Sequence, residues 1–324
     1  MKTTVIIPNY NGIKYLKDCL DSLLACRNRD FAIIVVDNGS TDGSLQEFES
    51  NYKATDISMI ALPENLGFAP AVNIGIEAAG TEYVLLLNND VTVDADFVTK
   101  LEEAIERDDR YFSVSAKMLD MHNPDLLDGT GDYYCALGWA FACGKGKNHS
   151  EARTKACKVF SACAGAAIYR RELLLEVGGF DANHFAYLED VDLGYRARIN
   201  GYVNMYEPEA VCLHAGSASS GSRYNEFKVN LSSRNSIYLI LKNMPLLQIV
   251  INLPFLIIGY AVKTLFFIRK GFGLTYIKGL GKGFALFFSK KGHVKKVHFK
   301  LKNLGNYCMI QLELWVNMIR RLCG

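Results

Sequence analysis

Asn88, Asn89 and Asp90 form a polar tripeptide that could bind a metal. They directly follow the apolar run 84–87. One carboxylate beside amide oxygens suits Mg²⁺ or Mn²⁺ when phosphates supply the remaining ligands. Amides and carboxylates are also common where a strand runs into a turn. The segment therefore has two interpretations, a metal site at Asp90 or a turn.

Three acids, Glu189, Asp190 and Asp192, lie at the start of a helix predicted at 190–200. The helix macrodipole stabilises a carboxylate at this end by about 0.3 to 1 kcal/mol, which accounts for one or two of them. Repulsion among three acids would raise the pKa of one, as suits a general base. Asp190 is therefore a candidate base.

Two further side chains have both a chemical and a structural interpretation. Asp37 ends a predicted strand at 32–36, where it could accept the N3–H of a pyrimidine or cap the turn at Gly39. His214 has small and apolar neighbours. It could be a second metal ligand or a structural histidine.

Apolar, β-branched runs alternate with segments of helical periodicity through the first 200 residues. This alternation predicts an α/β fold with a mainly parallel, Rossmann-like sheet flanked by helices. Ligands of such sheets bind beyond the carboxyl ends of the strands, and polar residues stand at three predicted ends, 8–10, 37–38 and 88–90. Residues 119–160 are predicted as long loops that could contain a hairpin. Strands are predicted at 3–7, 32–36, 57–62, 83–87, 112–118 and 163–169, and helices at 13–26, 44–51, 68–79, 94–107, 172–177 and 190–200.

Charge divides the chain into two parts. Residues 1–226 hold 20 Lys and Arg against 33 acids, a net of −13, whereas residues 227–324 hold 16 Lys and Arg against Glu313 alone, a net of +15. A basic, apolar segment suits an anionic surface, and its many Leu, Ile and Phe favour lipid over nucleic acid. We predict a body at 1–240 and a helical, membrane-associating tail at 241–324.

The segment 246–268 has the roughly 20 apolar residues that span a bilayer. Basic residues follow from Arg269 onward. An interfacial helix with basic anchors is therefore predicted, on a peripheral or monotopic protein. The residues that argue against a clean span are Gln248, Asn252, Pro254 and Lys263.

The sequence lacks the signature motifs of several protein classes. There is no G-x-x-x-x-G-K-[ST] loop, no G-x-S-x-G, and no G-x-G-x-x-G at the first helix, which argues against P-loop NTPases, α/β-hydrolases and dinucleotide binders. The nine cysteines form no C-x-x-C pair, so a zinc site is not expected. An odd cysteine count with no secretory leader predicts a reducing, cytoplasmic compartment.

Five ordered motifs stand out in the body, at 5–12, 35–44, 65–69 with Asn73, 86–91, and 178–181 with 189–192. Together they resemble the family-2 inverting glycosyltransferases of the GT-A fold, over residues 3–240. The Asn-Asn-Asp form and the tail resemble rhamnosyltransferase-like and galactofuranosyltransferase-like members of bacterial polysaccharide assembly.

The resemblance implies a role for each motif. The uracil or thymine pocket would contain Pro8, Tyr10 and Asp37. Asn65 would contact the nucleotide, and Asn73 would support its loop. The other implied nucleotide-sugar contacts are Asn88, which replaces the first acid of the family's D-x-D motif, and Asn89.

The resemblance also implies a metal and a base. Asp90 would hold Mg²⁺ or Mn²⁺ together with His214, and Asp190 would be the general base. The implied activity moves a sugar from dTDP-rhamnose or a UDP-sugar to a hydroxyl of a glycan or lipid-linked acceptor. A lipid-linked acceptor would explain the tail, which would bring the enzyme to the inner face of the plasma membrane.

Two other functions remain to be weighed. An inactive relative would bind nucleotide-sugars without turnover, although Asp90 and Asp190 are both retained. A nucleotidyltransferase would need a glycine-rich, basic loop after the first strand, where this chain has the segment 9–12, Asn-Tyr-Asn-Gly.

Overall fold

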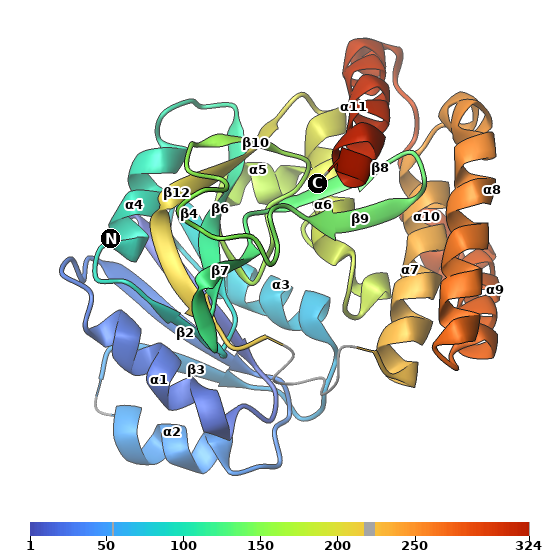
Figure 1. Cartoon of the computed structure of the whole chain (residues 1–324). Coiled ribbons are helices and arrows are strands. Elements are labelled where there is room, and N and C mark those ends of the chain that lie inside the picture. Colours follow the sequence, from blue (N-terminus) through green and yellow to red (C-terminus); the bar gives the residue numbers. More distant parts are fainter. Residues whose placement is uncertain (54, 217–223, 324) are drawn as a thin grey trace.

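The computed structural model describes residues 1–53, 55–216 and 224–323 (Figure 1). A mixed sheet forms its centre, in the order β10-β12-β6-β11-β4-β1-β2-β3, with β5 beside β12 and β7 beside β6. The strands of this sheet are β1 (Thr3–Asn9), β2 (Phe31–Asp37), β3 (Ile57–Ala61), β4 (Tyr83–Leu87), β5 (Val91–Val93), β6 (Tyr111–Asp120), β7 (Asn123–Gly129), β10 (Cys157–Val159), β11 (Ala166–Arg170) and β12 (Val203–His214).

The strands β3, β2, β1 and β4 pair in parallel, as the alternating pattern predicts. Strand β11 lies antiparallel between β4 and β6, and β12 then pairs in parallel with β6. The α/β architecture is therefore confirmed, with the parallel strands at one side of a mixed sheet. The carboxyl ends of β1, β2 and β4 lie at one edge.

Helices cover both faces of this sheet. One face packs against α1 (Ile13–Leu24), α2 (Ser44–Tyr52) and α4 (Phe97–Ile105). The other face packs against the remaining three helices of the body. Because both faces are covered, the central strands are continuous apolar runs. Those three helices are α3 (Phe68–Ala78), α5 (Arg171–Glu176) and α6 (Glu189–Ile199).

The C-terminal part is helical, as predicted, and lies beside the sheet domain (Figure 1). Its last helix packs back on the body, because Ile310 and Leu314 share a core cluster with Tyr134 and Tyr195. The predicted boundary after residue 240 falls inside a continuous helix. The elements are α7 (Glu226–Asn243), α8 (Leu246–Arg269), α9 (Gly273–Phe288), α10 (Lys290–Val294), η2 (Leu301–Asn303) and α11 (Leu304–Cys323).

Segment 119–160 is more ordered than predicted. It holds the expected hairpin, β8 (Asp132–Cys135) with β9 (Trp139–Ala142), and also the strands β7 and β10. A short 3₁₀ helix, η1 (Ala182–His184), precedes α6.

Candidate functional site

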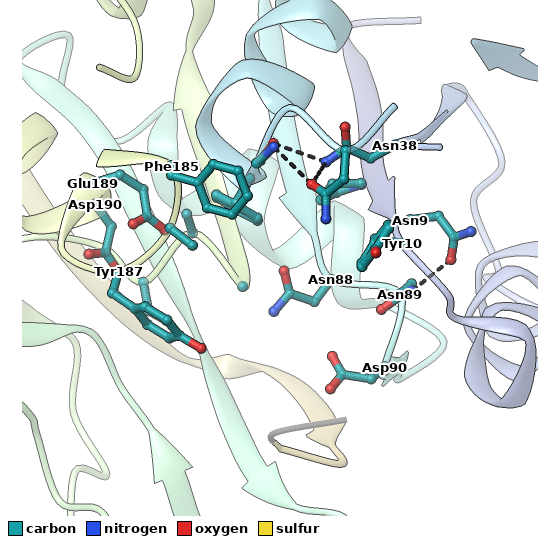
Figure 2. A pocket seen from close by; sticks show the side chains of 18 of the residues that line it. Asn9, Tyr10, Asn38, Asn88, Asn89, Asp90, Phe185, Tyr187, Glu189 and Asp190 are labelled. Atoms are coloured by element: carbon teal, nitrogen blue, oxygen red, sulfur yellow. Dashed lines mark hydrogen bonds between the residues drawn. The ribbon is translucent and has the colours of Figure 1, made fainter. Parts of the chain in front are cut away.

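A pocket of about 430 Å³ opens at the carboxyl ends of β1, β2 and β4. Its walls come from these strand ends and from the segment before α6, whose labelled side chains Figure 2 shows. The start of α7 also contributes to the wall. The structure thus brings together residues from distant parts of the chain. All the predicted site residues except Asp37 line it: Pro8, Tyr10, Asn65, Asn88, Asn89, Asp90, Asp190 and His214.

Asp37 lies behind the pocket wall, at 2% exposure. Its carboxylate accepts hydrogen bonds from Asn9 Nδ2 at 2.8 Å and from the backbone N–H of Ser40 at 3.0 Å. Asn9 Oδ1 in turn accepts from Asn89 Nδ2 at 2.7 Å. The turn-capping interpretation of Asp37 is thus the one that the geometry displays, and Asn9 stands between Asp37 and the cavity.

Asn38 holds the loop that carries Asn65. Its Nδ2 donates to Asn65 Oδ1 at 3.0 Å and to the carbonyl of Gly67 at 3.1 Å. The predicted support from Asn73 is wrong, because that side chain exchanges two hydrogen bonds with the backbone of Phe180. Asn73 therefore fixes the segment that leads toward α6.

One side of the pocket carries Asp90 and His214. Strand β12 places the histidine, which pairs in register with Val91 of β5. His214 Nε2 lies 3.3 Å from Asp90 Oδ1, and Nδ1 lies 2.7 Å from Asp128 Oδ2. Burial opposes a charge on the ring, but hydrogen bonds to Asp128 and Asp90 raise the pKa of His214 to about 9.

The other side carries the acids that precede and begin α6. Burial raises the pKa of Asp190 to about 6, against the hydrogen bond from the Val191 N–H. Burial and the charge of Asp190 raise the pKa of Glu189 to about 8. Asp132 is also close: its carboxylate, Asp190 and the Cys163 thiol offer atoms within 4.8 Å of one another. Burial, followed by the charge of Asp190, raises the pKa of Asp132 well above its usual value.

Asp190 and Asp90 point into the cavity from opposite sides (Figure 2). The pocket therefore has a proton acceptor on one side and a candidate cation site on the other. Such an arrangement can deprotonate a nucleophile and stabilise an anionic leaving group. Sequence reasoning missed four side chains at or beside this cavity. They are Asp128, Asp132, Phe185 and Tyr187.

Residues 4–178 match the family model "Glycosyl transferase family 2". This is more than half of the chain, and the chain belongs to that family. It is therefore a glycosyltransferase, as predicted, and the alternative of a nucleotidyltransferase is excluded.

Two curated relatives are similar over the body. The chain is 28% identical over 242 residues to the N-acetylglucosaminyl-diphospho-decaprenol L-rhamnosyltransferase of Mycobacterium tuberculosis strain H37Rv, which is 67% of this chain and 77% of that protein. It is 26% identical over 211 residues to the poly-beta-1,6-N-acetyl-D-glucosamine synthase of Staphylococcus aureus strain COL, which is 64% of this chain. That match spans only 48% of the synthase.

Solved structures share the fold. S. aureus TarS 1–349 in complex with UDP-GlcNAc matches with a TM-score of 0.59 at 19% identity, over 91% of this chain and 84% of that one. A mannosyltransferase from Pyrobaculum calidifontis, solved with GDP-Man and Mn²⁺, matches with a TM-score of 0.53 at 18% identity, over 97% and 84%. The GT-A architecture predicted for the chain is thereby confirmed.

Proposed function

We propose that this glycosyltransferase moves a sugar from a nucleoside-diphosphate donor to an acceptor hydroxyl, with inversion at the anomeric carbon. The observation that carries the proposal is the placement of Asp190, which faces Asp90 across the pocket and has a raised pKa. A base and a leaving-group site on opposite sides of one cavity suit a single displacement.

The chemistry is a balanced exchange of two bonds. Asp190 takes the proton of the acceptor hydroxyl while the hydroxyl oxygen forms a bond to the anomeric carbon. The bond from that carbon to the diphosphate oxygen breaks, and the nucleoside diphosphate leaves with the electron pair. Inversion follows because nucleophile and leaving group occupy opposite faces of the sugar.

The residues around Asp90 fit a divalent cation, Mg²⁺ or Mn²⁺. A carboxylate and an imidazole nitrogen lie 3.3 Å apart at the pocket wall, and Asp128 holds the far side of the imidazole, as carboxylates do behind metal-binding histidines. The pKa of about 9 leaves the ring protonated at neutral pH, so a cation bound by Nε2 would displace that proton. Bound there, the cation would supply positive charge to the departing diphosphate. Asn88 and Asn89 supply neutral oxygens nearby, so phosphate oxygens would complete the coordination.

The relatives support a proposal for the donor and the acceptor. A rhamnosyltransferase and an N-acetylglucosamine polymer synthase favour dTDP-rhamnose or a UDP-sugar, and the name of the first favours a lipid-diphosphate-linked glycan as acceptor. Pro8, Tyr10, Asn65, Asn88 and Asn89 would then contact the donor. Asp37 would reach a base only through rearrangement of Asn9.

An anionic membrane surface is the proposed partner of α8. Among the described residues, this is the one helix long and apolar enough to cross a membrane. Its polar residues face the protein: Gln248 accepts from the Tyr195 hydroxyl at 2.6 Å, and Asn252 exchanges two hydrogen bonds with Gln311. The large exposed side chains of α8 that precede Arg269 are instead apolar, namely Leu246, Leu247, Val250, Ile251, Leu253, Ile257, Ile258, Val262, Leu265, Phe266 and Ile268.

A helix with its polar side inward and its apolar side outward suits a lipid environment. Exposed basic residues flank the surface, among them Arg269, Lys270, Lys278 and Lys282, and they would contact anionic head groups. We therefore propose a cytoplasmic protein held in monotopic fashion on the inner face of the plasma membrane, where a lipid-linked acceptor would be within reach.

A donor screen tests the proposed activity. Purified full-length chain would be incubated with dTDP-rhamnose, UDP-GlcNAc, UDP-galactose or UDP-galactofuranose and Mn²⁺ or Mg²⁺, in the presence of membrane lipid extract. We expect release of nucleoside diphosphate from at least one donor, by transfer or by hydrolysis. Absence of turnover with every donor would favour the inactive-relative alternative.

A further inference from the structure

Residues 185–188 form a strained segment of the pocket wall. Phe185 has φ 62 and ψ −64, and the N–H of Ala186 donates to the carbonyl of His184 at 2.7 Å, which closes a three-residue turn. Tyr187 and Leu188 follow with φ 71 and φ 66. A positive φ angle costs free energy in a residue other than glycine, and three such residues lie in this segment. The surrounding structure must therefore hold them in this conformation.

Asn235 of α7 makes the contacts that hold this segment. The side chain is fully buried. Its Nδ2 donates to the carbonyls of His184, Ala186 and Tyr187 at 2.9, 2.8 and 2.7 Å. The two hydrogens of this one amide group are therefore shared among three carbonyls of a segment that has no regular backbone pairing of its own.

Arg234 adds a second set of contacts from the same turn of α7. Its Nη2 donates to the carbonyls of Asn183 and His184 at 2.9 and 2.8 Å. Its Nε donates to Asn235 Oδ1 at 2.8 Å, so the amide is oriented with its N–H groups toward the segment. The assignment of oxygen and nitrogen in Asn235 is thus fixed by its partners.

The held segment leads directly to the proposed base. Phe185, Ala186 and Tyr187 line the pocket, and Leu188 is the residue before Glu189 and Asp190 at the start of α6. A change in the path of 185–188 would therefore move both the pocket wall and the base.

Helix α9 fixes α7 from its other side. A Cβ atom on Gly283 would lie 2.4 Å from the carbonyl of Arg234, and one on Gly279 would lie 1.8 Å from Ser233 Oγ. The helices can approach this closely only because these residues are glycines. Gly281, between them, has open space around its Cβ position, which provides a matched control.

We propose that Asn235 is a positioning residue: it holds segment 185–188 in its strained path and thereby places Asp190, and the seating of α7 against α9 maintains that arrangement. The expected loss of kcat rests on the proposed function. The claim that Asn235 holds segment 185–188 does not, and it can be tested without measuring turnover.

The test compares Asn235→Asp with Ser236→Ala. The first keeps the shape of the side chain and an acceptor for Arg234, but loses both N–H donors. The second removes a buried hydroxyl from the same turn, one that bonds within α7 and to Tyr260 and not to the segment. Hydrogen–deuterium exchange of peptides covering 183–192, thermal unfolding, UDP and dTDP binding with Mn²⁺, and donor turnover would be measured for each.

We expect faster exchange across 183–192 in Asn235→Asp and wild-type exchange there in Ser236→Ala. Nucleotide binding should be retained while kcat falls by about 100-fold, because small displacements of a catalytic group are that costly. Gly283→Ala should give the same pattern more weakly, and Gly281→Ala should give none. If Asn235→Asp does not fold, the comparison of Gly283→Ala with Gly281→Ala tests the proposal instead.

Wild-type exchange across 183–192 in both Asn235→Asp and Gly283→Ala would overturn the proposal. So would a kcat loss in Asn235→Asp equal to that in Ser236→Ala. A wild-type chain that turns over none of the donors would instead count against the proposed function, and the exchange comparison would still decide whether Asn235 holds the segment.

Discussion

His214 Nε2 lies 3.3 Å from Asp90 Oδ1, so an imidazole from β12 meets a carboxylate that follows β4. Asp128 fixes the other ring nitrogen at 2.7 Å and is itself paired with Lys145 at 2.5 Å. The orientation of His214 is thus determined by a side chain outside the pocket. Such outer partners orient metal ligands and raise their basicity.

Asp128→Ala should weaken metal binding without removing a direct ligand. We expect the Mn²⁺ affinity of the UDP or dTDP complex to fall about 10- to 100-fold, the usual cost of losing a carboxylate that hydrogen-bonds to a metal ligand. Calorimetric titration with Mn²⁺ measures this. The matched control is Asp125→Ala, an exposed acid on the same strand. Equal Mn²⁺ affinities in the two variants would contradict the role of Asp128.

Asp90→Ala should remove the carboxylate ligand itself. We expect nucleoside diphosphate binding to become insensitive to EDTA and weaker than in the wild type, because the cation no longer links the protein to the phosphates. Binding of UDP and dTDP with and without EDTA gives the measurement. A variant that still binds more tightly with Mn²⁺ would show that the metal lies elsewhere.

Asp190→Asn should separate binding from chemistry. The amide keeps the size of the side chain but cannot accept the acceptor proton, so transfer should fall by about 10²- to 10⁴-fold, the range for loss of a general base. Nucleotide binding should be retained, because the nucleotide contacts lie across the pocket. Parallel loss of binding and transfer would instead indicate a structural role for Asp190.

The pH dependence of turnover should have an acidic limb near pH 6. The pKa of Asp190 is raised to about 6 by burial; above this pH the carboxylate is ionised and can accept a proton, and below it the base is blocked. The pKa of Glu189 is raised further, to about 8, so Glu189 is already neutral across that limb. Glu189→Gln should therefore leave the limb in place. A limb near pH 4 in the wild type would show that Asp190 is not the titrating base.

The sequence pattern predicted the parallel half of the fold well, for a physical reason. Strands such as β4, Tyr83–Leu87, are buried on both faces, so their residues form an unbroken apolar run. Strand β12 gave no such signal. Glu207 and Pro208 interrupt its pattern, and the strand accommodates them with an irregularity between Tyr206 and Val211.

The site was predictable where it depends on strand ends. Parallel strands carry their carboxyl ends to one edge, so Tyr10 and Asn88 could be placed together without knowing any loop. The positions of Asp128 and Asp132 could not be predicted in this way, because both residues belong to segment 119–160, whose path depends on distant contacts. Likewise, Gln248 and Asn252 interrupt the apolar pattern of α8 in the sequence, and only the packed structure reveals that they face the protein.

Membrane binding is testable on the outward side of α8. Deleting 246–324 would also remove Ile310 and Leu314 from the core of the body, so single substitutions are the sharper test. Ile258→Glu and Leu265→Glu alter side chains that are 56% and 60% exposed. Each loses the burial of one large apolar side chain in lipid, about 1.5 to 3 kcal/mol, so vesicle affinity should fall by about tenfold or more.

Flotation with vesicles containing phosphatidylglycerol, or phosphatidylcholine alone, measures this binding. The matched control is Leu175→Glu on α5, where a leucine of 43% exposure lies outside the C-terminal helices. Lys278→Glu combined with Lys282→Glu should reduce flotation with the anionic vesicles and leave any binding to neutral vesicles unchanged, because only the anionic surface attracts these lysines. Equal flotation of the α8 variants and Leu175→Glu would show that lipid does not cover α8, and its apolar side would then need a protein partner.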